Sequence, residues 1–535
     1  MEHYLMSYFP KTTIQGITDA GNPIDISAEQ EGHLEVAIHG PLNPFYSVHT
    51  ESLTPIFQMD PLYGVNEAIA NVTTGLAVGF GANSATASAA NNYFVCSTGT
   101  TQYSFGTIQS LRRLRYRPGQ GVIIRAAGKF STPAANSILV LGCGSSESGF
   151  FFGYNGTTFG ILYSTGGVRE IQTLTVTTAS TSTQPYNIGL PSGETVNVTA
   201  TNSGSTVKTA YEIAQGTFPG WKAAASGSTV VFVKDSVGGV SMITLGQSGA
   251  GTPAAGTFVE TKAGAAATDT WIAQSTWNGD KLDGTGASGV TLDPSKGNVY
   301  QINIQYLGAG AVDFKIEVPS VDGNNSTMVT VHTLNFPNSL TTTIVSQPVF
   351  PFTMAAYSAG STTDVAVYVS SAAGFIEGQR ALTGPRQTYF SLSTAVTTTN
   401  YYALFTIRNN LSYGGRANQS VVNLLSFGGA HDDATPVTFF LIRNGTLSAT
   451  PNFSQWATSS CTSAYKPASG SAETVTFSSN DQVLLSLPVS QSGAGFYIFE
   501  DNVTLQPGET VTVAAQTVTG TSTYTIATLN TREDQ

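Results

Sequence analysis

An arginine-rich stretch is the first place in this sequence where residue types and spacing could support chemistry. It contains Arg112, Arg113, Arg115 and Arg117. In an extended strand the last three share one face, opposite Leu114 and Tyr116. Arginine suits planar, bidentate pairing at buried surfaces, so we expect an interface strand that binds carboxylates of a neighbouring chain. The alternative is a phosphate or polyanion site.

An acidic loop offers a possible metal site. Residues 277–284 contain Asp280 and Asp283, and Asp293 follows shortly after. Oxygen-rich loops can bind Ca²⁺, although this spacing does not fit an EF-hand. We expect no metal here, and these three aspartates are the calcium candidates. The alternative is that they form turns with their own backbone in a surface loop.

Catalytic patterns are missing from the sequence. His431-Asp432-Asp433 places a base beside two carboxylates, but a hydrolase also needs a nucleophile and an oxyanion site. No G-x-S-x-G pattern lies at a strand-to-helix turn, and there is no H-E-x-x-H pattern. Two of the 33 acidic residues could still serve a glycosidase. We expect a protein that is not an enzyme and has no cofactor.

The composition indicates a weakly charged β protein. Of the 535 residues, 10% are charged and 56 are glycine, whereas about 25% charged residues is typical. The net charge of −11 argues against nucleic-acid binding. No apolar stretch reaches the ~18 residues of a membrane-spanning helix. The start of the chain lacks a signal-peptide pattern, and three cysteines far apart support neither a disulfide framework nor a metal site.

Alternating apolar and polar residues predict many short strands. Residues 300–306 and 312–318 alternate on either side of a glycine-rich break, which predicts an antiparallel hairpin. Residues 150–155 and 158–163 predict a second hairpin that turns at Asn-Gly. The best helical pattern covers 207–215. We therefore predict a mainly β protein with several β-sandwich or jelly-roll-like domains, one carrying a small inserted α+β module.

Shifts in composition predict four regions. Residues 1–120 form an N-terminal β region, to which the resemblance described below adds an anchoring role, and 121–390 form a lectin-like β-sandwich. A module at 176–275, rich in Ser, Thr, Gly and Ala, interrupts this sandwich. Residues 391–535 form a C-terminal β-sandwich.

Several segments resemble a known class of protein. They are Ser110–Gly121 with its aromatic-Arg-Pro-Gly-Gln turn, Gly153–Gln172, Gly297–Gly308, and Leu505–Val513 with the pattern L-x-P-G-E-T-x-T-V. These segments resemble virion structural proteins, of the fibre or minor capsid type, of marine tailed phages and large algal DNA viruses. A further segment, Thr209–Phe232, is similar to small inserted modules of phage tail and fibre proteins.

The resemblance implies a multidomain β-sandwich protein on the particle exterior. Such a fibre, vertex or minor capsid component forms a homotrimer, binds other shell or tail proteins, and is made in the host cytoplasm before it enters the virion. The segment Ile14–Asn66 would anchor it to the particle, and the C-terminal sandwich would face outward to contact the host. The resemblance carries no catalytic residues.

Two other functions remain open from the sequence. The first is a carbohydrate-binding, lectin-like adhesion protein, in which Trp277 and Trp456 stack on host-surface glycans; alternatively, these tryptophans are core or interface anchors. The second is a polysaccharide depolymerase. That class usually has a long β-helix with regular repeats, and no such repeat is present in the sequence.

Overall fold

The computed structural model describes residues 15–17, 23–25, 53–319, 325–378, 384–391, 394–468, 472–499 and 503–534. The chain divides into two compact units, Met1–Glu51 and Ser52–Gln535. In the first unit, the described residues form the antiparallel pair β1 (Gln15–Ile17) and β2 (Pro23–Asp25). Most of the expected anchor, Ile14–Asn66, lies outside the described residues.

The described part of the second unit is almost entirely β, as the sequence pattern predicts. Its α-helix, α1 (Thr206–Ala214), falls within one residue of the expected helix. No helix in the described residues is long and apolar enough to span a membrane.

A central sandwich contains two large antiparallel sheets. In sheet order, the first consists of β19 (Thr268–Ala273), β11 (Thr158–Thr165), β10 (Gly149–Asn155), β9 (Ser137–Gly144), β23 (Val349–Ser358), β7 (Ser104–Arg115) and β4 (Ala70–Leu76). The second consists of β22 (Ser326–Leu334), β21 (Val312–Pro319), β20 (Asn298–Ile304), β8 (Val122–Phe130), β24 (Ala366–Glu377), β6 (Tyr93–Ser97) and β5 (Thr86–Ala90), with β3 (Leu53–Met59) also pairing β24.

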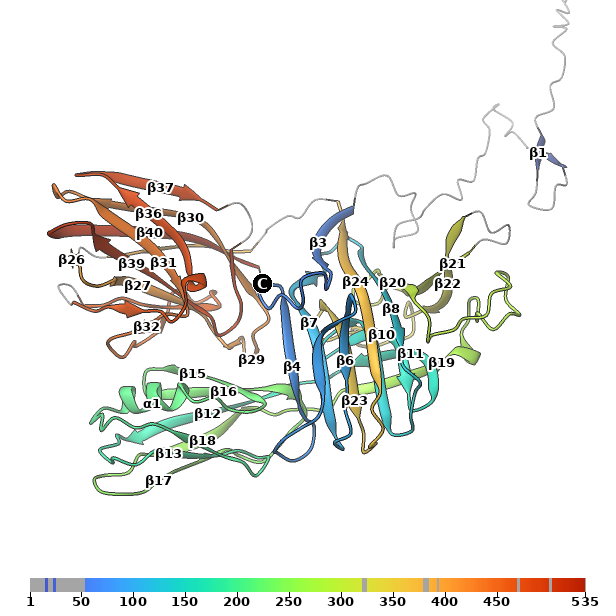
Figure 1. Cartoon of the computed structure of the whole chain (residues 1–535), viewed down its shortest axis with the longest axis horizontal. Helices are drawn as coiled ribbons and strands as arrows, with labels where there is room; N and C mark the ends of the chain where they lie inside the picture. Colours follow the sequence, from blue (N-terminus) through green and yellow to red (C-terminus); the bar gives the residue numbers. More distant parts are fainter. Residues whose placement is uncertain are drawn as a thin grey trace, which may run out of the picture. The chain divides into compact units, whose positions relative to one another are not determined.

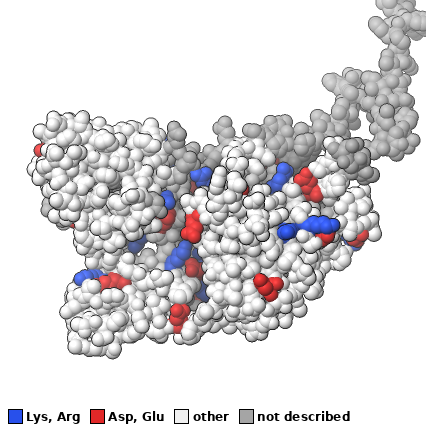
Figure 2. Space-filling model, in the orientation of Figure 1, with Lys and Arg blue, Asp and Glu red and all other residues white. Residues whose placement is uncertain are grey.

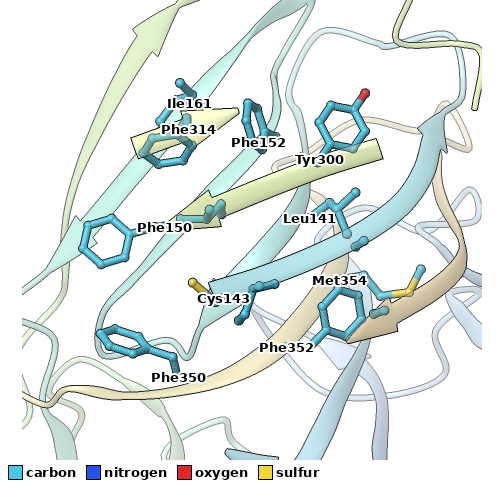
Figure 3. Packing of buried hydrophobic residues seen from close by; sticks show 14 of the residues in the cluster. Leu141, Cys143, Phe150, Phe152, Ile161, Tyr300, Phe314, Phe350, Phe352 and Met354 are labelled. Carbon is cyan, nitrogen blue, oxygen red and sulfur yellow. The ribbon is translucent and has the colours of Figure 1, made fainter. Parts of the chain in front are cut away.

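Both expected hairpins are present in this sandwich. β10 pairs β11 in a register that aligns Asn155 with Thr158, and β20 pairs β21. Phe152 of the first sheet meets Phe314 of the second, with ring centroids 5.2 Å apart and nearly perpendicular planes. Both side chains are fully buried, and Figure 3 shows them among other aromatic side chains of the core. The alternating pattern of each hairpin therefore turns its apolar face toward the opposite sheet.

The strand pairing shows that residue 120 is not a boundary between an N-terminal region and the central sandwich. In one sheet β7 pairs with β23 and β4 pairs with β7 (Figure 1), and β3, β5 and β6 belong to the other sheet. The stretch from 53 to 115 is therefore part of the central sandwich and not a separate anchoring region. The reason is burial: these strands supply Phe57, Phe94 and Ile108 to the common core.

The inserted module is a smaller α+β unit. Its sheets are β15 (Trp221–Ser226), β16 (Thr229–Val237), β12 (Arg169–Thr178) and β18 (Ala255–Lys262), and β14 (Thr195–Val198), β13 (Tyr186–Gly189) and β17 (Thr244–Gln247). Helix α1 buries Ala210 and Ile213 in the module's own core. The module begins earlier than the expected residue 176, because β12 pairs β16 and β18 of the module.

The C-terminal sandwich has two six-stranded sheets. One contains β25 (Arg386–Phe390), β40 (Thr521–Asp534), β30 (Val421–His431) and β37 (Ala494–Ile498) in that order, with β26 (Thr394–Thr397) pairing β40 and β38 (Thr504–Leu505) pairing β30. The other contains β33 (Ser454–Gln455), β34 (Thr462–Tyr465), β27 (Tyr402–Asn409), β39 (Thr510–Thr517), β31 (Val437–Arg443) and β36 (Val483–Val489). Because β25 pairs β40, this sandwich begins before the expected residue 391.

The three cysteines are buried and free. Burial raises the pKa of the Cys96, Cys143 and Cys461 thiols well above the ordinary value, and the thiolate is the reactive form. We expect none of them to react with a disulfide reagent at pH 8 in the folded protein, and all three to react after denaturation in guanidinium. A thiol that reacts rapidly in the folded protein would contradict this burial.

Candidate functional site

The arginine-rich stretch covers the end of β7 and the two residues that follow it. Leu114 and Tyr116 are buried on one face, as the alternation predicts. On the other face, Arg115 Nε lies 3.6 Å and Arg117 Nη2 lies 2.8 Å from Oδ1 of Asp534. Asp534 ends β40, the last strand of the C-terminal sandwich. The carboxylate that we expected from a neighbouring chain is thus present within the same chain.

Hydrogen bonds extend this contact. Arg113 Nη1 donates to Gln419 Oε1 at 3.4 Å, and Arg115 Nη2 donates to the main-chain oxygen of Gln419 at 3.2 Å. Gln419 Nε2 in turn donates to Glu147 in the central sandwich, and Arg169 lies 3.2 Å from that carboxylate. Burial and the nearby charge of Arg169 lower the pKa of Arg113 to about 10. We call Arg113, Arg115, Arg117, Gln419 and Asp534 the arginine seam.

The arginine seam leaves little room for a ligand. The adjacent cavity, which Arg112 also lines, has a volume of about 30 Å³, room for one or two water molecules. Arg115 and Arg117 are already ion-paired. This geometry suits a structural contact between the two sandwiches better than a polyanion site.

The three aspartates that are calcium candidates each accept hydrogen bonds from their own loop. Asp280 accepts hydrogen bonds from the main-chain nitrogens of Leu282 at 2.9 Å and Ser288 at 2.7 Å. Asp283 and Asp293 accept hydrogen bonds from residues two positions further along the chain. The pKa values of all three are lowered; for Asp283 and Asp293 the main cause is these hydrogen bonds. Over the described ranges, no group of three or more His, Cys, Asp or Glu side chains is arranged to hold a metal.

The His431-Asp432-Asp433 stretch fastens one end of the C-terminal sandwich. His431 is buried, and its Nε2 lies 2.7 Å from the main-chain oxygen of Ser490. Asp433 accepts hydrogen bonds from Ser522 Oγ at 2.8 Å and from the main-chain nitrogen of Thr523 at 2.5 Å. These bonds lower the pKa of Asp433. The stretch therefore ties a loop to the start of β40.

Asp433 is expected to contribute pH-dependent stability. Its pKa is lower in the folded chain, so the ionised carboxylate stabilises the fold above the unfolded pKa. This contribution is lost as the pH falls through the folded pKa. We expect Asp433→Asn to lower the thermal unfolding midpoint at pH 7, and the difference from the unsubstituted chain to shrink on acidification. Asp432→Asn, at an exposed position, is the matched control. An Asp433→Asn deficit that is equal at every pH would contradict the assignment.

The two tryptophan candidates have different environments. Trp277 is 2% exposed and packs against Phe152 and Phe159 in the central core. It is therefore unavailable to stack on a sugar, and its proposed glycan role is wrong. Trp456 is half-buried in the C-terminal sandwich, with its ring centroid 6.0 Å from that of Phe390.

Trp456 belongs to an aromatic edge on the C-terminal sandwich. The side chain of Phe390, at the end of β25, is 48% exposed. Lys466 Nζ lies 3.7 Å from the centroid of the Phe390 ring and 4.7 Å from that of Trp456. We call Phe390, Trp456 and Lys466 the aromatic edge.

A groove runs beside the aromatic edge, over the outer face of the sheet β25-β40-β30-β37. Its volume is about 480 Å³, within the range of small-ligand sites. Asn530, which lines the groove, donates from Nδ2 to Ser426 Oγ at 2.9 Å and accepts from Thr388 Oγ1 at 2.7 Å. Phe496 and Ile498, 63% and 65% exposed, form an apolar wall on β37. Arg386 lines the opposite side.

Sequence reasoning missed this groove. One signal was present: Phe496, Tyr497 and Ile498 are three consecutive large apolar residues, and all three are exposed. A strand with one buried face alternates, so an uninterrupted run on an edge strand indicates a surface for binding. The groove combines polar groups with an apolar wall, a combination typical of binding sites.

Comparisons with known proteins give little guidance. Neither protein-family models nor curated proteins match the sequence. Among solved structures, one similar chain comes from work on endo-acting O-glycanases that human gut microbiota express to initiate mucin breakdown. It is 9% identical, with 61% of this chain and 100% of that chain covered and a TM-score of 0.26. A likeness of this size supports no statement about activity.

Proposed function

We propose that this chain is a non-enzymatic structural protein on the exterior of a virus particle. It holds β-sandwich domains in a fixed assembly, forms a homotrimer, and turns its C-terminal sandwich toward the host surface. The observation that carries the proposal is the arginine seam, which joins the central and C-terminal sandwiches by ion pairs within one chain.

The segments that resemble virion proteins support the proposal by their positions. Ser110–Gly121 contains the end of β7 and the arginines of the seam. Gly297–Gly308 contains β20, and Leu505–Val513 runs into β39, both of which supply buried residues to a sandwich core. The similarity therefore lies in residues that build the domains and join them. Figure 2 shows few charged side chains on the face that it presents, as suits a sandwich protein packed against other β domains.

Particle location and mass test this proposal. We expect the chain in purified particles, with an antibody to the C-terminal sandwich labelling their exterior, and a trimer by native mass spectrometry. A chain that lacks Met1–Glu51 should stay folded, because Ser52–Gln535 is a compact unit, but should fail to enter particles. Absence of the chain from particles would overturn the proposal. A monomeric mass would contradict the homotrimer but not the location on the particle.

A second candidate is a glycan-binding adhesion protein. It is favoured by the groove on the C-terminal sandwich, where exposed aromatic rings lie beside hydrogen-bonding side chains. The two roles are compatible, because an exterior virion protein that contacts a host surface needs a binding site on its outward domain.

A further inference from the structure

Three cations lie in or near the groove of the C-terminal sandwich. Arg386 lines the groove, Arg532 is aligned with Arg386 on the neighbouring strand, and Lys466 lies over the rings of Phe390 and Trp456 at the aromatic edge. The net charge of the whole chain is −11. A local cluster of cations in so acidic a chain indicates a site for a negatively charged ligand.

Two of these cations are cross-strand neighbours. Arg386 of β25 lies directly opposite Arg532 of β40, so their side chains leave the sheet on the same face. Like charges in this arrangement destabilise a sheet unless an anion lies between them. No carboxylate in the described part of the chain is ion-paired with either arginine, and Arg532 Nε is buried without a hydrogen-bond partner there.

Next to the arginines is a row of neutral polar groups. Thr388, Asn530 and Ser426 occupy one rung across three strands and are joined by hydrogen bonds. Asn530 and Ser426 retain lone pairs, and the Ser426 hydroxyl hydrogen is free to donate, because Ser426 accepts from Asn530. The row therefore offers both donors and acceptors to hydroxyl groups of a ligand.

Aromatic rings lie at both edges of this face. Phe390 is aligned with Thr528, Thr528 with Gly428, and Gly428 with Phe496. The two phenylalanines are thus three strand spacings apart, about 14 Å. A Cβ atom at Gly428 would lie 3.1 Å from Thr528 Oγ1 and 3.6 Å from the Phe496 ring. Glycine at this position therefore leaves the surface between the two rings free of a side chain.

We propose that this face binds an acidic oligosaccharide. Sugar rings lie against Phe496 and along the floor toward the aromatic edge, their hydroxyl groups bind Asn530 and Ser426, and a carboxylate or sulfate group lies between Arg386 and Arg532. Such a ligand complements the face in three ways. Its apolar C–H surfaces contact the aromatic rings, its hydroxyl groups bind the polar row, and its planar or tetrahedral anion pairs with the arginines. A flat protein partner would use the apolar wall but leave the recessed polar row unfilled. This inference rests on the proposed role in surface contact and names the ligand of that surface.

Titration calorimetry on the full chain tests the proposal with three probes: a polyuronate oligomer, a sulfated galactan oligomer and a neutral glucan of equal length. We expect one of the acidic probes to bind at least about tenfold more tightly than the glucan. Arg386→Gln should weaken that binding about tenfold, the loss of a charge-assisted contact. Phe496→Ala should weaken all sugar binding. Arg416→Gln, an exposed arginine elsewhere in the same domain, should leave it unchanged.

Several results would overturn the proposal. One is failure of all three probes to bind; another is acidic-probe binding that Arg386→Gln and Phe496→Ala leave intact. A change in oligomeric mass on Phe496→Ala, without any sugar binding, would assign the face to a second copy of the chain. Each of these results leaves the particle location and the truncation phenotype untouched. Failure of the glycan site is therefore distinguishable from failure of the virion role.

Discussion

Replacement of Phe152 by alanine is expected to lower the free energy of unfolding by about 3–5 kcal/mol. Phe152 is fully buried between the two sheets of the central sandwich and contacts the rings of Phe314, Tyr300 and Trp277. Its removal loses the transfer free energy of the ring and leaves a cavity that aromatic neighbours from both sheets cannot fill without moving. Chemical denaturation followed by intrinsic fluorescence measures the change.

Phe496 provides the matched control for this prediction. It is the same residue type on a strand of the same class, but its side chain is mostly exposed. We expect Phe496→Ala to change the free energy of unfolding by no more than about 0.5 kcal/mol. A loss at Phe496 similar to that at Phe152 would mean that the exposed wall of the groove is covered in solution, which would bear directly on the glycan proposal.

Local patterns in the sequence predicted the local structure well. Both hairpins and the helix required only alternation, an Asn-Gly turn and a 3.6-residue period, and all are present. The expected boundaries at residues 120, 176 and 391 differ from those of the strand pairing, because boundaries depend on pairing over long distances. Gln109 and Thr353, for example, pair across the sheet although they are 244 positions apart in the sequence, and no local pattern encodes that partner.

The candidate site likewise has features that the sequence predicts and features that depend on long-range pairing. Trp456 was identified from residue type, and the structure places it at the aromatic edge, whereas Trp277 has the same type and is buried. The groove depends on the register of four strands that are far apart in the sequence. Register decides that Arg386 and Arg532 are neighbours, and the sequence does not specify it.

The arginine seam should control how firmly the C-terminal sandwich is held. Asp534→Ala removes the carboxylate that Arg115 and Arg117 share, and both guanidiniums are mostly buried. Breaking a buried pair from one side costs about 3–5 kcal/mol; because these side chains retain some exposure, we expect about 2–3 kcal/mol. The loss should appear as earlier unfolding of the C-terminal sandwich in calorimetry and as faster hydrogen exchange around Gln419.

A double-mutant cycle separates the ion pair from other effects of the substitution. Asp534→Ala combined with Arg117→Gln should cost less than the sum of the two single changes, because the second no longer removes a partnered charge. Asp432→Ala, an exposed aspartate in the same sandwich, should leave stability nearly unchanged. If Asp534→Ala behaved like Asp432→Ala, the seam would be a surface ion pair of little value. The fixed joining of the two sandwiches, on which the proposed structural role rests, would then need another source.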